Sequence, residues 1–229
     1  MTDHGLGVEG THHDAADRGD AEALRRLLAE GVSPVATDYF AGTPLHCLCK
    51  SSRKATGDLA ACIKLLLDAG ANLEAVDSDR WTPLHRAANF ANVEIMSLLV
   101  EAGAKVNAVT VVGWRPLHYA ALWSGTVDCV EVLLAAGADI DARDNYGRTP
   151  FDIALANDKR RMWPVFLRAG AEIPNSSRPY IVRVRNAGGF KKYAQEHLAR
   201  ITSILAPTPR LPPEMVRKIV EFWLHAGFY

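Results

Sequence analysis

The chain has no hydrophobic run long enough to cross a membrane, and its N-terminus, MTDHGLGVEGTHHD, has no hydrophobic core of a secretory signal. We therefore expect a soluble, intracellular protein in the cytoplasm or the nucleus. Cysteine is scarce, and its four positions show no paired spacing: Cys47, Cys49, Cys62 and Cys129. We expect reduced, packed thiols, because His46 alone does not supply the second ligand pair that a zinc site at Cys47 and Cys49 needs.

Motifs of catalysis and of nucleotide or metal binding are missing as well. The chain contains no GxSxG, no HExxH, no phosphate loop GxxxxGK[ST] and no EF-hand pattern. His46, His85 and His118 resemble a row of bases or ligands, but each recurs in the same TPLH-like context, which favours a structural hydrogen-bonding role. His12 and His13 do not by themselves indicate a metal site. We predict no enzyme activity, no cofactor and no metal.

Charge is balanced overall but separated along the chain. Residues 1–158 contain 13 Lys and Arg against 22 Asp and Glu, and residues 159–229 contain 13 against 4. The two parts therefore carry net charges of −9 and +9. The basic part is a candidate contact for an acidic surface, and the alternative is that the two parts attract each other.

A repeat organises most of the chain. The fragment GTPLHCLCK at 42–50 recurs as WTPLHRAAN at 81–89, WRPLHYAAL at 114–122 and RTPFDIALA at 148–156. The spacings are 39, 33 and 34 residues. A second fragment recurs in phase, and its glycines mark five units: Gly31, Gly70, Gly103, Gly137 and Gly170.

Each unit predicts a turn, a short helix, a tight connection, a second helix such as Val93–Glu101, and a loop. The proline of TPLH suits the first turn of a helix, and the threonine before it can cap that helix. The glycine after the second helix suits a left-handed C-cap. No unit has enough apolar surface to fold alone, so neighbouring units must stack.

TPLHRAA at 82–88, followed by LLVEAGAKVNA at 98–108, closely resembles the ankyrin repeat. The resemblance covers about residues 11–173, between a flexible N-terminus at 1–10 and a helical C-terminal appendage at 174–229. The expected repeats lie near 11–38, 39–77, 78–110, 111–144 and 145–173. The resemblance implies an all-α solenoid of stacked helix pairs with hairpin loops. It also implies protein binding rather than catalysis.

Several units depart from the pattern. The first lacks TPLH, which suits an N-terminal cap, and the second carries about six extra residues around KSSRKATGD, which predicts a longer loop between its helices. Arg115 replaces the threonine of its unit, so we expect a weaker helix cap there. Pro164 falls inside the expected second helix of the fifth unit and predicts a bend, whereas Trp163 falls at a core position.

The ankyrin resemblance implies that the hairpin tips and the ends of the first helices face the concave side and contact the partner. Aligned on TPLH, these positions gather aromatic side chains, which are enriched at the centres of protein interfaces. With a polar rim, they form the expected partner-binding set: Phe40, Asp79, Trp81, Phe90, Val112, Trp114, Trp123, Arg143, Tyr146 and Arg148. The alternative is that single rings pack sideways on the next hairpin and are half-buried.

The chain after residue 173 no longer repeats. Residues 176–189 are ambiguous between a short helix and an extended basic stretch, whereas 190–205 place apolar residues on one helical face. LPPEMVRKIVEFW at 211–223 resembles the opening of an F-box, although a full F-box is about twice as long as the chain that remains. The resemblance implies contact with a ubiquitin ligase component through 211–229. The alternative is a helical cap on the last repeat.

These observations lead to one expected function and one alternative. We predict a non-catalytic scaffold or adaptor that binds a partner protein, of unknown identity, through the concave ankyrin face. The alternative is a substrate receptor of a ubiquitin ligase that uses the F-box-like C-terminus. We expect no membrane partner, and no recognised nucleic-acid-binding module accompanies the basic end.

Overall fold

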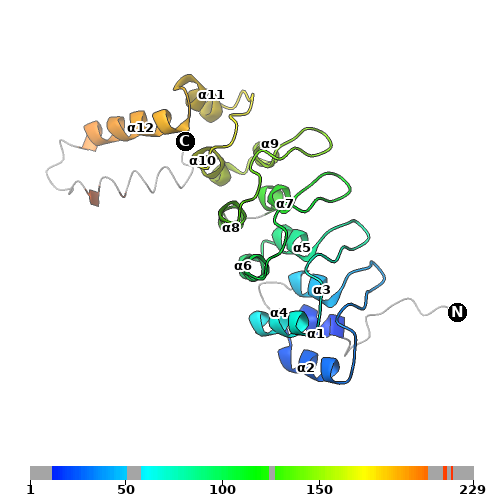
Figure 1. Cartoon of the computed structure of the whole chain (residues 1–229). Helices are drawn as coiled ribbons and strands as arrows, with labels where there is room; N and C mark the ends of the chain where they lie inside the picture. Colours follow the sequence, from blue (N-terminus) through cyan, green and yellow to red (C-terminus); the bar gives the residue numbers. More distant parts are fainter. Residues whose placement is uncertain (1–11, 51–57, 124–126, 206–213, 216–217, 219–229) are drawn as a thin grey trace.

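The computed structural model describes residues 12–50, 58–123, 127–205, 214–215 and 218, and the regular elements within this part are all helices (Figure 1). The all-α class is therefore confirmed. In chain order the helices are α1 (His12–Arg18), α2 (Ala21–Ala29), α3 (Pro44–Lys50), α4 (Leu59–Asp68), α5 (Pro83–Asn89), α6 (Val93–Glu101), α7 (Pro116–Trp123), α8 (Asp128–Ala135), α9 (Pro150–Ala156), η1 (Arg160–Met162), α10 (Trp163–Arg168), α11 (Pro179–Asn186) and α12 (Phe190–Leu205).

Three expectations concern segments outside the described residues. They are the flexible N-terminus at 1–10, the longer loop at 51–57, and almost all of the F-box-like segment at 211–229. These remain predictions.

The helices stack as pairs into a solenoid (Figure 1). Helices α1, α3, α5, α7 and α9 contact one another in sequence and form a first row, and α2, α4, α6 and α8 form a second row beside it. The loops that precede α3, α5, α7 and α9 project from the same side of the first row. The stacking that the repeat predicts is therefore present.

The TPLH fragment starts the first helix of a pair and also joins neighbouring pairs. At α5, the backbone N–H of Thr82 donates to His85 Nδ1 over 3.1 Å, and His85 Nε2 lies 3.3 Å from the Trp114 carbonyl oxygen of the next hairpin. Since Nδ1 accepts, Nε2 carries the proton and donates. His46 and His118 make equivalent bridges, and all three imidazoles are fully buried. The histidines therefore have the structural hydrogen-bonding role that the sequence predicts, and the structure shows in addition that they connect neighbouring repeats.

Second helices end at glycines with a left-handed backbone. Gly103, after α6, has a φ of +93°, and its N–H donates to the Val100 carbonyl oxygen over 2.9 Å. The next N–H, of Ala104, donates to the Leu99 carbonyl oxygen over 2.9 Å. A residue with a Cβ adopts this conformation only at a cost, so glycine is the residue that ends these helices cheaply.

The fifth helix pair corrects one expectation, because Pro164 does not bend a longer helix. A 3₁₀ turn, η1, precedes it, and α10 begins only at Trp163, which places the proline in the first helical turn. A proline there has no intrahelical N–H bond to lose. Trp163 is 5% exposed, and its Nε1 donates to the Ala154 carbonyl oxygen over 3.4 Å, which confirms its expected core position.

The described part of the appendage continues the core of the stack. Residues 179–186, for which the sequence allows two conformations, form α11, and their Tyr180, Ile181 and Val184 side chains are buried. Tyr180 stacks on Trp163 with 6.0 Å between the ring centroids, and α12 contacts both α10 and α11. Helices α11 and α12 therefore cover the end of the last pair, whose apolar face would otherwise meet water.

Candidate functional site

The hairpin loops and the first helices form one face of the stack, which we call the hairpin face (Figure 1). It comprises loops 36–43, 75–82, 108–115 and 142–149 together with α3, α5, α7 and α9. Every sequence-predicted binding residue lies on these elements or directly follows one of them. Their exposure divides them into a group that supports the hairpins and a group that faces solvent.

An aspartate holds the tip of three of the hairpins. Asp144 accepts hydrogen bonds from the backbone N–H groups of Tyr146 and Arg148, both at 2.9 Å. Asp38 and Asp77 make the same pair of bonds in their own hairpins. Burial alone raises the pKa of Asp144, but hydrogen bonds from Arg148 and Tyr146 outweigh it, so the pKa lies below its ordinary value. The tips are therefore rigid platforms for the side chains they carry.

Trp81 and Trp114 are half-buried and enclose Tyr119 between them. The ring centroid of Tyr119 lies 4.3 Å from that of Trp81 and 4.8 Å from that of Trp114, and Tyr119 is only 4% exposed. The indole Nε1 of Trp114 donates to Asp144 of the next hairpin over 2.9 Å. The sideways packing considered as the alternative for single rings therefore describes these two indoles.

Arg148 is exposed, but its side chain already contacts residues of its own hairpin and of the preceding one. Its guanidinium lies 5.8 Å from the ring centroid of Trp114 and 5.0 Å from that of Tyr146, and its Nε donates to Asp144 over 2.9 Å. Arg86 makes the same two kinds of contact, with an indole and an aspartate, two hairpins earlier. Both arginines thus brace the aromatic rings against the hairpins.

The remaining predicted residues face solvent, and most belong to two rows. The tip row occupies one equivalent position in successive hairpins: Phe40, Asp79, Val112 and Tyr146. The helix-end row consists of Phe90 and Trp123, at the ends of α5 and α7. Arg143 lies beside the tip row and pairs with Glu172 at 3.0 Å.

Neighbouring tips are joined through the backbone. The N–H of Ser78 donates to the Phe40 carbonyl oxygen over 3.0 Å, and the N–H of Asn145 donates to the Val112 carbonyl oxygen over 3.3 Å. Tyr39 and Val111 are adjacent to tip-row residues and are 95% and 56% exposed. Three apolar residues of the tip row, Phe40, Val112 and Tyr146, are therefore presented on tips that are hydrogen-bonded in pairs.

The cysteines and the possible metal ligands of the described residues show no arrangement that would bind a metal. All four cysteines are buried, and burial raises the pKa of Cys47 and of Cys62 to about 11, so these two thiols stay protonated at neutral pH. In the described part of the chain, no three His, Cys, Asp or Glu side chains are grouped to hold a metal. None of the described helices is long and apolar enough to span a bilayer.

Two family models describe the repeats. A model of three ankyrin repeats matches residues 12–110, and a model of many ankyrin repeats matches 88–134 and 117–163. The chain belongs to the ankyrin-repeat family. The histidine bridges recur at α3, α5 and α7, and a tip aspartate recurs in three of the four hairpins, whereas the residues of the tip row differ in every hairpin. The tip row is thus the part of the surface that differs from one repeat to the next.

Curated proteins are similar to parts of the chain. The chain is 35% identical to the transient receptor potential cation channel subfamily A member 1 homolog of Caenorhabditis elegans over 156 residues, 68% of this chain and 12% of that protein. It is 38% identical to human ankyrin repeat and SOCS box protein 11 over 86 residues, 37% of this chain and 24% of that protein. With human SH3 and multiple ankyrin repeat domains protein 2 the identity is 30% over 143 residues, 62% of this chain and 7% of that protein. The chain thus spans at most 24% of these relatives.

Sequence reasoning missed the residues that hold the site. Asp38, Asp77 and Asp144 each stand five residues before the first position of a TPLH-like fragment, and this recurrence is visible in the sequence. Tyr119 carries no such signal, because the equivalent positions of the other repeats hold cysteine, arginine and isoleucine. Only the packing of the rings between two hairpins identifies it.

Proposed function

We propose that the protein is a non-catalytic scaffold or adaptor that binds a partner protein through its hairpin face, the concave face of the ankyrin resemblance. Ankyrin repeats are protein-interaction modules, which supports a binding role. The observation that carries the proposal is the exposure of large apolar side chains on this face: Phe40 61%, Phe90 45%, Trp123 60% and Tyr146 76%. Exposed aromatic side chains on a rigid support are typical of interface centres.

The two groups of residues have different roles in this proposal. The tip row and the helix-end row contact the partner, and Asp79 and Arg143 supply polar contacts at the edge. Trp81, Trp114 and Arg148 act as positioning residues, since they are engaged with Tyr119 and Asp144. Substituting the positioning residues should therefore lower stability as well as binding.

Affinity purification of the tagged full-length chain, with mass spectrometry of the bound proteins, tests the proposal. The variant Phe40→Ala, Trp123→Ala, Tyr146→Ala removes three exposed rings. The control variant Val35→Ala, Leu198→Ala changes residues that are 49% and 38% exposed and lie outside both rows. We expect the triple variant to lose partners that the control retains. An unchanged set of partners, with an unchanged circular dichroism spectrum, contradicts the proposal.

A second candidate function is substrate recognition for a ubiquitin ligase. It is supported by the F-box-like LPPEMVRKIVEFW and by the similarity to a protein whose name combines ankyrin repeats with a SOCS box. In this function the hairpin face binds the substrate, and residues 211–229 bind a ligase component. Deleting 206–229 separates the two possibilities. Loss of a co-purifying ligase component at an unchanged melting temperature supports recruitment, whereas a lower melting temperature supports a structural cap.

We also propose that the protein acts in the cytoplasm or the nucleus. Imaging of a fluorescent full-length fusion tests it, and accumulation in the secretory pathway contradicts it.

A further inference from the structure

The appendage carries a second exposed feature, which differs in chemistry from the hairpin face. Residues 174–200 contain six Lys and Arg against one Glu, a net charge of +5. Most of these basic side chains are exposed: Arg183, Arg185, Lys191, Lys192 and Arg200. Arg178 instead pairs with Asp158 at 2.6 Å and so belongs to the contact between the appendage and the last helix pair.

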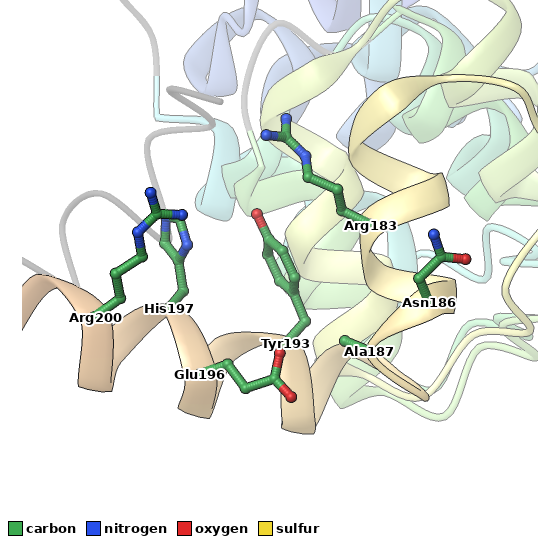
Figure 2. A pocket seen from close by; sticks show the side chains of 7 residues that line it. All are labelled: Arg183, Asn186, Ala187, Tyr193, Glu196, His197 and Arg200. Carbon is green, nitrogen blue, oxygen red and sulfur yellow. The ribbon is translucent and has the colours of Figure 1, made fainter.

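A pocket of about 450 Å³ lies where α11 and α12 meet (Figure 2). Its lining comes from the end of α11 and from one face of α12: Arg183, Asn186, Ala187, Tyr193, Glu196, His197 and Arg200. Figure 2 shows the side chains of Arg183, His197 and Arg200 on the same side as the Tyr193 hydroxyl, with the Glu196 carboxylate directed away from them. The volume suits a few side chains of a bound ligand.

The floor of the pocket is a fixed aromatic stack. Tyr193 is 7% exposed, and its ring lies 5.7 Å from Tyr180 in an edge contact and 5.4 Å from His197 in a stacked one. Tyr180 in turn stacks on Trp163 of the last repeat. The pocket is therefore anchored to the ankyrin stack and needs little ordering when it binds a ligand.

Positive charge dominates the wall above this floor. Burial lowers the pKa of His197, and the nearby charges of Arg200 and Arg183 lower it further, so the imidazole is neutral at pH 7 and both guanidinium groups act on it. Among the described residues, no carboxylate forms an ion pair with Arg183 of this wall. A ligand with negative charge would complement this wall.

We propose that this pocket binds a peptide segment of a partner protein that carries clustered negative charge. Its carboxylate or phosphate groups pair with Arg183 and Arg200, and an adjoining side chain rests on the rings of Tyr193 and His197. Guanidinium groups bind carboxylate and phosphate with two parallel hydrogen bonds, which favours arginine for this role.

A nucleic acid fits the same chain poorly. Residues 1–158 carry a net charge of −9, which repels an extended phosphate backbone that continues past the pocket. A short acidic peptide segment avoids this repulsion. The inference goes beyond the proposed function, because the hairpin face takes no part in it.

Fluorescence anisotropy with the full-length protein tests the proposal. The first probe is a dye-labelled octapeptide of aspartate and glutamate, and the second replaces its aspartates with phosphoserine. The third probe is a single-stranded oligonucleotide of equal charge. We expect saturable binding of at least one peptide, weakened by added salt, with the tighter peptide identifying the source of the negative charge. The oligonucleotide is expected to bind more weakly than that peptide.

Two variants with the same change in net charge locate the site. Arg183→Glu, Arg200→Glu is expected to weaken peptide binding at least about tenfold, because it reverses both charges of the wall. Lys191→Glu, Lys192→Glu alters α12 outside the pocket and is expected to weaken binding by about twofold or less. Asn186→Trp fills the exposed rim without a change of charge and is also expected to weaken binding. Circular dichroism checks the fold of each variant.

Three results would overturn the proposal. They are the absence of saturable binding to either peptide, equal losses in the two charge-reversal variants, and tighter binding of the oligonucleotide. If the arginine variant does not fold, Asn186→Trp decides, and wild-type affinity in that variant excludes the pocket as the site.

Discussion

The hairpin face and the appendage pocket differ in the forces that hold them and in the charge around them. Three of the hairpin tips are held by aspartates that accept backbone hydrogen bonds, and large apolar side chains such as Phe40 and Tyr146 are exposed on the tips. The pocket is held by stacked rings, and its wall is basic. One continuous helical stack can therefore present two surfaces of different chemistry, since each is supported independently.

The largest expected effect on stability distinguishes the buried Tyr119 from the exposed Trp123, which lie on the same helix, α7. Tyr119→Ala empties the space between Trp81 and Trp114, and we expect the free energy of unfolding to fall by about 3–5 kcal/mol. Trp123→Ala, four residues later and 60% exposed, should change it by about 0.5 kcal/mol or less. Urea unfolding measures both. Equal effects would show that Tyr119 does not belong to the core of the hairpin face.

Acid should lower the stability of the fold by protonating the buried histidines that connect the repeats. Burial lowers the pKa of His85 from an ordinary 6.5 to about 4, so the unfolded chain binds more protons than the folded one between these values. Stability should therefore hold above pH 6.5 and fall as the pH drops toward 4, by up to about 3 kcal/mol from this residue. Unfolding curves across this range measure the slope. His85→Gln should show a shallower slope, and an unchanged slope would exclude His85 as its source.

A smaller effect concerns the helix cap at Arg115. Its backbone N–H donates to His118 Nδ1 over 3.2 Å, but the side chain pairs with Asp139 at 2.7 Å and provides no hydroxyl like that of Thr82. Arg115→Thr restores the cap, while Arg115→Ala only removes the ion pair. We expect the threonine variant to exceed the alanine variant by about 1 kcal/mol in denaturant unfolding. Equal stability of the two variants would show that the hydroxyl contributes nothing.

The smallest effect on stability is expected for the exposed rings of the tip row, whose loss should weaken partner binding most. Phe40→Ala, Tyr146→Ala should alter the free energy of unfolding by about 0.5 kcal/mol or less, because both rings are exposed. The variant should lose hairpin-face partners and keep its affinity for the acidic peptide, and Arg183→Glu, Arg200→Glu should do the reverse. Affinity purification and anisotropy on both variants measure this. If either variant loses both kinds of binding, the two surfaces act as one.

Much of the repeat structure is predictable because it depends on local spacing. The positions of the second helices, the left-handed glycines and the histidine bridges all recur at fixed distances from TPLH. Pro164 was placed wrongly, because a helix that starts later meets the same proline without strain. The exposure of each aromatic ring could not be predicted from the sequence either, because it depends on how the ring packs against the neighbouring repeat.

The sequence by itself determined the ankyrin-repeat fold and the hairpin tips as the surface that differs between repeats. Periodicity carries this information, since each unit must bury the same face against its neighbours. Only the tertiary structure decided that Trp81 and Trp114 support the face while Phe40, Trp123 and Tyr146 extend from it. It also brought Arg183 of α11 and Arg200 of α12 to one pocket. Contacts between elements distant in the chain set these outcomes, because burial is a property of neighbours in space.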